Sequence, residues 1–153
     1  MAERGDAVTT VTVNSIRSGV ILALSDLFPE MDIYGEGIEQ DFDAPCFFVK
    51  LLTTGQDREM DRRYRRSYSF DIHYFPTSAD PNEEAHGMAE QLYDKLRQVN
   101  IDGELYRGAG MNHEVVDEVL HFFVDFNFHV FAEKPPGIKM QTLEQEGYLK
   151  NGN

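Results

Sequence analysis

The sequence predicts an α+β fold, with a mostly antiparallel sheet and two amphipathic helices on one of its faces. Residues 64–74 and 120–130 alternate, with large apolar side chains on even numbers and mostly polar side chains on odd numbers. A period of two is typical of strands with one buried face. In residues 13–28 and 85–99, apolar side chains instead recur at intervals of three and four residues, which is the period of a helix. Placing both helices on the same face of the sheet buries all of these stripes in one core.

The first helix is expected to begin near Val13 and to end at Phe28. Thr12 or Asn14 can serve as its N-cap, and Phe28 ends it because a residue before proline disfavours helical backbone angles. Its apolar stripe comprises Val13, Ile16, Val20, Ile21, Leu24, Leu27 and Phe28.

Three strands are expected next. Residues 33–35 suggest a short edge strand, and residues 47–53 form a compact apolar run suited to a buried strand. The polar stretch 54–63 is predicted to be the long basic tip of a hairpin. The second strand of that hairpin then runs over residues 64–75 and stops at Pro76.

The second helix has a clear start signal. Asp80 is suited to the N-cap, Pro81 to the first helical position, and Glu83 lies three residues after the cap. Its expected apolar stripe is Ala85, Met88, Ala89, Leu92, Leu96 and Val99.

The last part of the domain is expected to hold two strands. Asp102-Gly103 is a tight-turn signal, which predicts a small hairpin leading into Tyr106. Gly108 and Gly110 are predicted to lie in a connection to the last strand, whose length suggests a bend or bulge. The expected order is therefore α, β, β, β, α, β, β.

The length of 153 residues fits one domain, at 12–133, between a flexible N-terminus (1–11) and a flexible C-terminal extension (134–153). The net charge of −13 argues against unspecific adhesion to nucleic acid or to anionic membranes. No stretch approaches the roughly 20 apolar residues that span a bilayer. The single cysteine, Cys46, excludes an internal disulfide and is interpreted as a buried core thiol. We therefore expect a soluble protein of a reducing cytoplasm.

An arginine cluster is the first candidate site. Residues 58–66 hold five arginines and two acids, so this segment carries +3 and the rest of the chain −16. The cluster can contact a partner or a second copy, pair with local acids at Asp57, Glu59 and Asp61, or touch nucleic acid. The acidic body argues against the last of these. The interface candidates in this cluster are Arg58, Arg62, Arg63, Arg65 and Arg66.

The odd-numbered face of the two long strands is the second candidate. Phe123 and Phe131 lie among polar residues there, which indicates an interface or a surface covered by the C-terminal tail. His121, Asp125 and His129 are spaced by four residues, or about 13 Å along a strand, too far to share one metal ion.

Only a cross-strand group, for example Asp71 or His73 with a residue of the last strand, can bring metal ligands together, and the sequence does not give the register. No metal site is therefore predicted. His113-Glu114 is too common a pair to indicate catalysis. The glycine pairs at 35 and 37 and at 108 and 110 lack the lysine and the spacing of a phosphate-binding loop. We predict no catalytic residue and no cofactor.

Several segments, taken in order, resemble a phage tail terminator family found in Bacillus and Clostridium prophages with tails of the PBSX type. They are residues 33–36, 45–51, 62–76, 115–125 and 139–147. The arginine-rich strand, which reads Arg62-Arg63-Tyr64-Arg65-Arg66, and the closing segment 139–147 are the most specific of these.

The resemblance implies a structural role. Such terminators are small α+β proteins that assemble as a hexameric ring on the head-proximal end of the tail tube. The ring stops tube growth and presents the surface to which the head joins. The implied partners are other copies of the chain, the tube protein, a neck or head-completion protein and the sheath of a contractile tail, while DNA passes without specific binding. The implied location is the virion tail, assembled in the host cytoplasm. Two alternatives stay open: a neck connector, and a small metal-dependent enzyme that uses the histidines.

Overall fold

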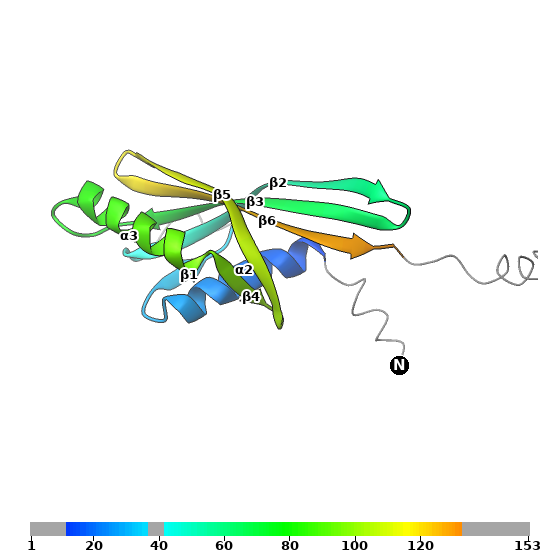
Figure 1. Ribbon diagram of the computed structural model, residues 1–153. Coiled ribbons are helices and arrows are strands. Elements are labelled where there is room, and N and C mark those ends of the chain that lie inside the picture. The colour runs from blue at the N-terminus through cyan, green and yellow to red at the C-terminus, as the bar shows by residue number, and fades with distance from the viewer. Residues whose placement is uncertain (1–11, 37–41, 133–153) are drawn as a thin grey trace, which may run out of the picture.

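In the computed structural model, residues 12–36 and 42–132 are described, and they form a six-stranded sheet with two helices on one face (Figure 1). The elements are α2 (Val13–Leu27), β1 (Asp32–Tyr34), β2 (Cys46–Met60), β3 (Arg63–Phe75), α3 (Pro81–Lys95), β4 (Gln98–Ile101), β5 (Glu104–Val116) and β6 (Val119–Phe131). The strand order is β1-β2-β3-β6-β5-β4. The β1–β2 pair is parallel and the other pairs are antiparallel. The predicted fold class is confirmed, and the predicted flexible ends at 1–11 and 134–153 lie outside the described residues.

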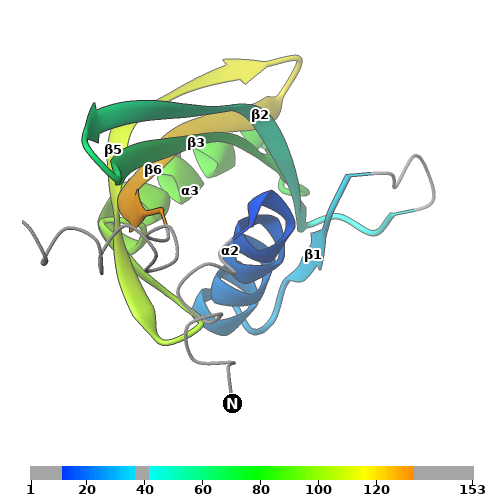
Figure 2. The ribbon, with the colours of Figure 1, turned by 90° about the vertical axis from the view of Figure 1, so that its right-hand side faces the viewer.

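The sheet curls around helix α2. Figure 2 looks along the sheet and shows α2 on its concave side, and α2 packs against β1 and β2 on one side and against β4 on the other. Thr12 and Ser15 form a reciprocal capping box at its start, and Phe28 is its C-cap. Ile16, Val20 and Leu24 are almost completely buried, which confirms the predicted stripe.

Helix α3 covers the centre of the sheet, where it packs on β3, β5 and β6. Asp80 caps it as predicted, because its side chain accepts from the Glu83 backbone N–H at 3.2 Å. One part of the predicted stripe is wrong. The helix ends at Lys95, and Val99 lies on β4, although its side chain is buried as expected.

Glu84 ties the start of α3 to the preceding loop and to β3. Its carboxylate accepts hydrogen bonds from the backbone N–H groups of Thr77 (3.1 Å) and Ser78 (2.8 Å) and from the hydroxyl of Tyr74 (2.5 Å). Burial alone would raise the pKa of Glu84, but the bonds from Tyr74, Ser78 and Thr77 outweigh it and lower the pKa below 4.5. The carboxylate is therefore more stable in the folded than in the unfolded chain.

We expect Glu84→Gln to lower the free energy of unfolding by about 1–2 kcal/mol at neutral pH, because charge-assisted hydrogen bonds are lost. A carboxyl whose folded pKa is depressed stabilises the fold above its unfolded pKa, and this stabilisation disappears as pH falls through the folded pKa. The difference in free energy of unfolding between wild type and variant should therefore disappear at acidic pH. Urea unfolding at a series of pH values from neutral to acidic measures this difference. Glu83→Gln, in the same helical turn but exposed, is the matched control, and a gap of equal size there would contradict the assignment.

The β2–β3 hairpin differs from the prediction. Instead of ending at residue 53 in a long loop, β2 continues to Met60, and the tip is only Asp61 and Arg62. The strand beyond residue 52 is exposed on both faces, so it has no apolar alternation that would reveal it as a strand. Together with the end of β6 it extends past the helices, as the right side of Figure 1 shows. We call this extension, residues 55–67 and 127–131, the arm.

The β4–β5 turn is as predicted, with positive φ at Asp102 (55°) and Gly103 (85°). The glycine-rich connection, however, is a strand. Gly108 and Gly110 lie inside β5, so the domain contains one strand more than the predicted order. The bulge expected in the last strand is found in β5, where the register against β6 shifts between Ala109 and Asn112.

The core lies between the helices and the even-numbered side chains of the two long alternating strands. The buried members include Phe70, Ile72, Leu120, Phe122, Val124 and Phe126, each at 0% exposure. This result confirms the prediction that the even-numbered side chains of both strands face the core. It also leaves their odd-numbered side chains on the opposite side of the sheet, which we call the open face.

Candidate functional site

The five predicted arginines all belong to the arm, and their partners lie in the arm or directly beside it. Arg63 Nε lies 3.1 Å from Glu59 Oε1, and the same carboxylate oxygen lies 3.1 Å from His129 Nε2 on β6. Arg65 lies 3.7 Å from Asp57. The local acids named by the sequence analysis are therefore within ion-pair distance. All of these side chains are at least one-third exposed, and such surface pairs contribute little to stability, so an incoming acidic surface can replace them at small cost.

Three of the arginines use uncharged acceptors. Arg58 donates to the backbone carbonyl of Asp61 at 2.9 Å, across the tip of the hairpin. Arg66 donates to the side chains of Gln56 (2.8 Å) and Tyr68 (3.1 Å). Arg62 donates to the carbonyl of Ala132 at 3.1 Å, and its own carbonyl accepts from the Ala132 N–H at 2.8 Å. The two Arg62–Ala132 bonds attach the tip of the hairpin to the end of the chain after β6, and the β3–β6 pairing makes the arm three-stranded.

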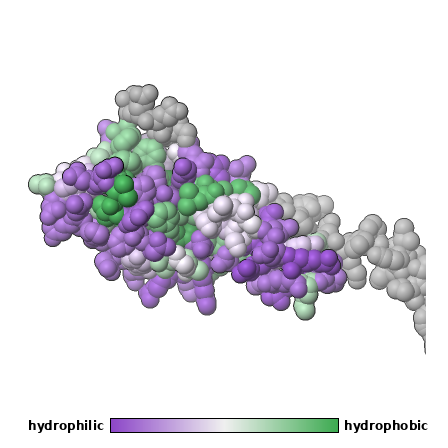
Figure 3. Space-filling model, turned by 90° about the horizontal axis from the view of Figure 1, so that it is seen from above, coloured by the Kyte–Doolittle hydropathy of each residue, from purple (hydrophilic) through white to green (hydrophobic). Residues whose placement is uncertain are grey.

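The two predicted aromatic residues do not form one patch. Phe131 is 56% exposed at the end of the arm, whereas Phe123 is partly buried in the middle of the open face. Eight residues of strand separate them, or roughly 27 Å. Each therefore has to be considered with its own neighbours. Figure 3 looks onto the open face and shows small hydrophobic areas among hydrophilic ones, with a largely hydrophilic arm at the right.

An open pocket of about 780 Å³ lies on the side of the arm that faces the helices. Its walls are the start of α2, the β4–β5 turn and the end of β6. Leu105, at the β4–β5 turn, is 64% exposed and lines it together with Phe131. The sequence did not predict this pocket, because it depends on how α2, the β4–β5 turn and the end of β6 come together in space.

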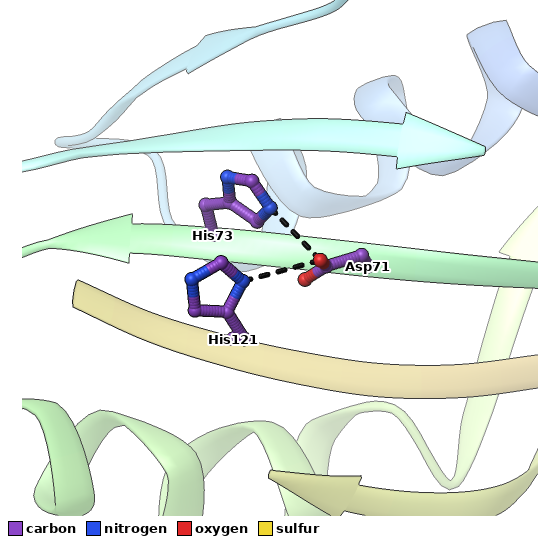
Figure 4. Close-up of side chains that lie close together, drawn as sticks. All are labelled: Asp71, His73 and His121. Atoms are coloured by element: carbon purple, nitrogen blue, oxygen red, sulfur yellow. Dashed lines mark hydrogen bonds and ion pairs between the residues drawn. The ribbon is translucent and has the colours of Figure 1, made fainter. Parts of the chain in front are cut away.

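The open face brings together Asp71, His73 and His121 (Figure 4). His73 and His121 are direct cross-strand partners, and Asp71 lies two residues before His73 on the same face. Asp71 Oδ2 lies 2.9 Å from His73 Nε2 and 3.2 Å from His121 Nδ1. The two imidazole rings meet edge to face, with centroids 4.3 Å apart. Sequence reasoning named this kind of cross-strand group but had no register with which to find it.

Asp71 is the one buried charged residue in the described part of the chain, with 7% of its surface exposed. Burial acts to raise the pKa of its carboxyl group, but the hydrogen bonds from His73 and His121 and the charges of these histidines lower it overall. The carboxylate is thus ionised in a largely desolvated position.

An aromatic cluster lies beside these residues. Phe42, Phe48 and Phe75 pack with ring centroids 4.8–5.4 Å apart, and Tyr34 packs on Phe48 at 5.1 Å. Phe48 is the cross-strand partner of His73, so the cluster borders the histidines directly. The rings are partly exposed. Because the sequence alone did not place Phe42 over the sheet, this surface was not predicted.

The other predicted groups are not assembled into a catalytic site. His113 and Glu114 point to opposite faces of β5. His113 contacts His86 (3.0 Å) and Tyr93 (2.9 Å) on the side of α3, whereas Glu114 is the partner of His121 on the open face. Burial and the nearby Asp32 and Asp43 raise the pKa of the Cys46 thiol to about 11, which fits the predicted inert core thiol. Among the described residues, no helix is long and apolar enough to cross a membrane.

Comparisons with known proteins address the family directly. The family model described as phage tail terminator protein matches residues 15–138, which is most of the chain. A search of curated proteins found no match. A solved structure without a functional description is similar at a TM-score of 0.44 and 15% identity, over 82% of this chain and 99% of its own. The family match agrees with the resemblance inferred from the sequence, and the chain belongs to the phage tail terminator protein family.

Proposed function

We propose that this chain assembles as a ring on the head-proximal end of the tail tube, where it stops tube growth and presents the surface to which the head joins. The observation that carries the proposal is the family match, which assigns a structural role in phage tails. Its partners are other copies of the chain, in a ring of six, the tube protein, a head-completion protein and, in a contractile tail, the sheath. DNA passes through the ring without specific binding.

The charge distribution supports a ring built from identical neighbours. A ring with head-to-tail contacts requires that each subunit present two different, complementary surfaces. The arm concentrates five arginines, whereas the remainder of the chain is strongly acidic. Opposite charges on two separate surfaces steer such contacts and fix their orientation. The acidic remainder also disfavours adhesion of DNA, whose affinity for proteins is dominated by phosphate contacts.

The shape of the arm supports the same interface. The arm extends past the helices, carries two exposed large apolar side chains, Met60 (63% exposed) and Phe131, and has the open pocket on one side. Apolar side chains in a charged surround are a common arrangement at protein interfaces. We place one ring contact, or the contact with the tube, on the arm.

Polymerisation of the tube protein of the same phage tests the proposal. Purified tube protein is allowed to elongate with and without this chain, and tube lengths are measured by electron microscopy. If the chain caps tubes, mean length falls as its concentration rises, and the chain is found at one end of each tube by labelling. A heat-unfolded sample is the control. Unchanged lengths with no end labelling would contradict a capping role, and binding along the whole tube would indicate a sheath-like role instead.

A further inference from the structure

We propose that Asp71, His73 and His121 form a binding site for a divalent transition-metal cation of the zinc class on the open face of the sheet. This site is separate from the arm and independent of the proposed capping role. Asp71 and His73 come from β3 and His121 from β6, so a bound cation would connect the two central strands.

The distances between ligand atoms suit one shared ion. Zinc lies about 2.0–2.2 Å from imidazole nitrogen and carboxylate oxygen, so two ligands of a tetrahedral ion are about 3.3 Å apart. Asp71 Oδ2 is 2.9 Å from the nearest ring nitrogen of His73 and 3.2 Å from that of His121. One ligand atom from each of the three residues lies within 4.8 Å of the others. Small side-chain rotations are therefore sufficient to place all three on one cation.

The protonation chemistry is also suitable. Zinc binds the neutral imidazole, and each histidine can present the nitrogen that now faces Asp71 as an acceptor by adopting its other neutral tautomer. A cation would take the place of the two hydrogen-bonding protons between the carboxylate and the rings.

The environment of Asp71 gives the second argument. Its Oδ1 atom is buried and has no hydrogen-bond partner among the described residues. A buried charged oxygen without a partner is costly, and a cation bound through one or both carboxylate oxygens removes that cost. The histidine side chains remain about one-quarter exposed, so an ion can reach the site from solvent.

The strands on either side contribute opposite charges. Glu114 on β5 is the cross-strand partner of His121, and its exposed side chain lies on the same face. On the other side, the positively charged Lys50 on β2 is the cross-strand partner of Asp71. We assign Glu114, or water, to the fourth position, because zinc sites with three protein ligands keep one position for an exchangeable group.

Zinc titration of the untagged, chelator-treated full chain tests the site, since a histidine tag binds the same ions. Calorimetry is expected to give about one Zn²⁺ per chain, and Co²⁺, used as a spectroscopic probe, should show the visible absorption of a tetrahedral site. His73→Gln and Asp71→Asn should each weaken Zn²⁺ binding by at least about tenfold. Glu114→Gln should weaken it less.

His113→Ala is the matched control, because it removes an imidazole from the other histidine pair of the chain, His86 and His113. Wild-type binding in this variant, with loss in His73→Gln, supports the proposal. Binding that is lost in His113→Ala and kept in His73→Gln would overturn it, as would the absence of Zn²⁺ binding by the wild type at about 100 μM. Circular dichroism confirms that each variant is folded. If Asp71→Asn unfolds, the partly exposed His73→Gln still decides the question.

Discussion

Reversing two charges on the arm, in the double variant Arg62→Glu and Arg65→Glu, is expected to leave the subunit folded and to produce tails of abnormal, variable length. Neither side chain contributes to the core, and their ion pairs with Asp61 (3.9 Å) and Asp57 (3.7 Å) are exposed. The substitution also removes the exposed bond from the Arg62 side chain to the Ala132 carbonyl, but the backbone bond from the Ala132 N–H to the Arg62 carbonyl remains. The free energy of unfolding should therefore fall by at most about 1–2 kcal/mol. The arm would lose the positive charge that we propose it offers to an acidic neighbour. Complementation of a phage lacking the gene, followed by electron microscopy of the tails, measures the effect.

The matched control reverses two arginines outside the arm, Arg17→Glu and Arg97→Glu. This variant changes the net charge by the same amount, and its surface ion pairs with Glu36 (3.6 Å) and Asp94 (3.0 Å) are similar in kind. Normal tails are expected. If the arm variant also gave tails of normal length, the arm would not be a ring or tube contact, although the capping role itself would survive. Equal defects in both variants would indicate a general charge effect instead.

Gly108→Ala is expected to destabilise the fold strongly, by about 1–3 kcal/mol or more. A Cβ at this position would lie 2.3 Å from the backbone oxygen of Leu96 and 3.1 Å from Cγ2 of Val124. Because the first contact is with backbone, no side-chain rotation relieves it. The Gly108 N–H also donates to the carbonyl of Arg97 at 3.1 Å, so β5 is held against the end of α3 at this point. Chemical denaturation of the purified chain measures the loss.

Gly55→Ala is the control for that variant. Gly55 is also inside a strand, but nothing lies within 4 Å of the position of a new Cβ. Alanine there should be neutral or slightly stabilising, since glycine is unfavourable in strand interiors. A similar loss of stability in both variants would mean that the close approach of β5 to Leu96 does not constrain the fold.

The elements that could be predicted from the sequence are those with one buried face. Helix α2, the buried stripe of α3 and the parity of β3 and β6 all follow from apolar periodicity, and the Asp80 cap and the Asp102-Gly103 turn follow from local chemistry. The arm portion of β2 could not be predicted, because its side chains are exposed on both faces and leave no alternation. Most of β5 was missed for another reason: its inward-facing positions are only partly buried and include Gly108 and His113, so their apolar alternation is weak. Pairing with a neighbouring strand, which is a long-range property, makes these segments strands.

The candidate site shows the same division. The arginine cluster is evident as a run of residues and lies on one arm, but its local ion pairs depend on the register of β2 against β3. Phe123 and Phe131 are both odd-numbered residues of β6, but they do not lie on one surface patch. The grouping of Asp71 and His73 with His121 requires the β3–β6 register, which joins residues about 50 positions apart and which no local pattern specifies.

Electron microscopy of particles produced with and without this gene tests the capping role most directly. Capping predicts that, without the gene, tails grow to abnormal and variable lengths and lack heads, and that a plasmid copy restores a uniform length. Tails of normal, uniform length that fail to join heads would contradict capping and would indicate a neck protein instead. Unchanged particles would contradict any structural role in tail assembly.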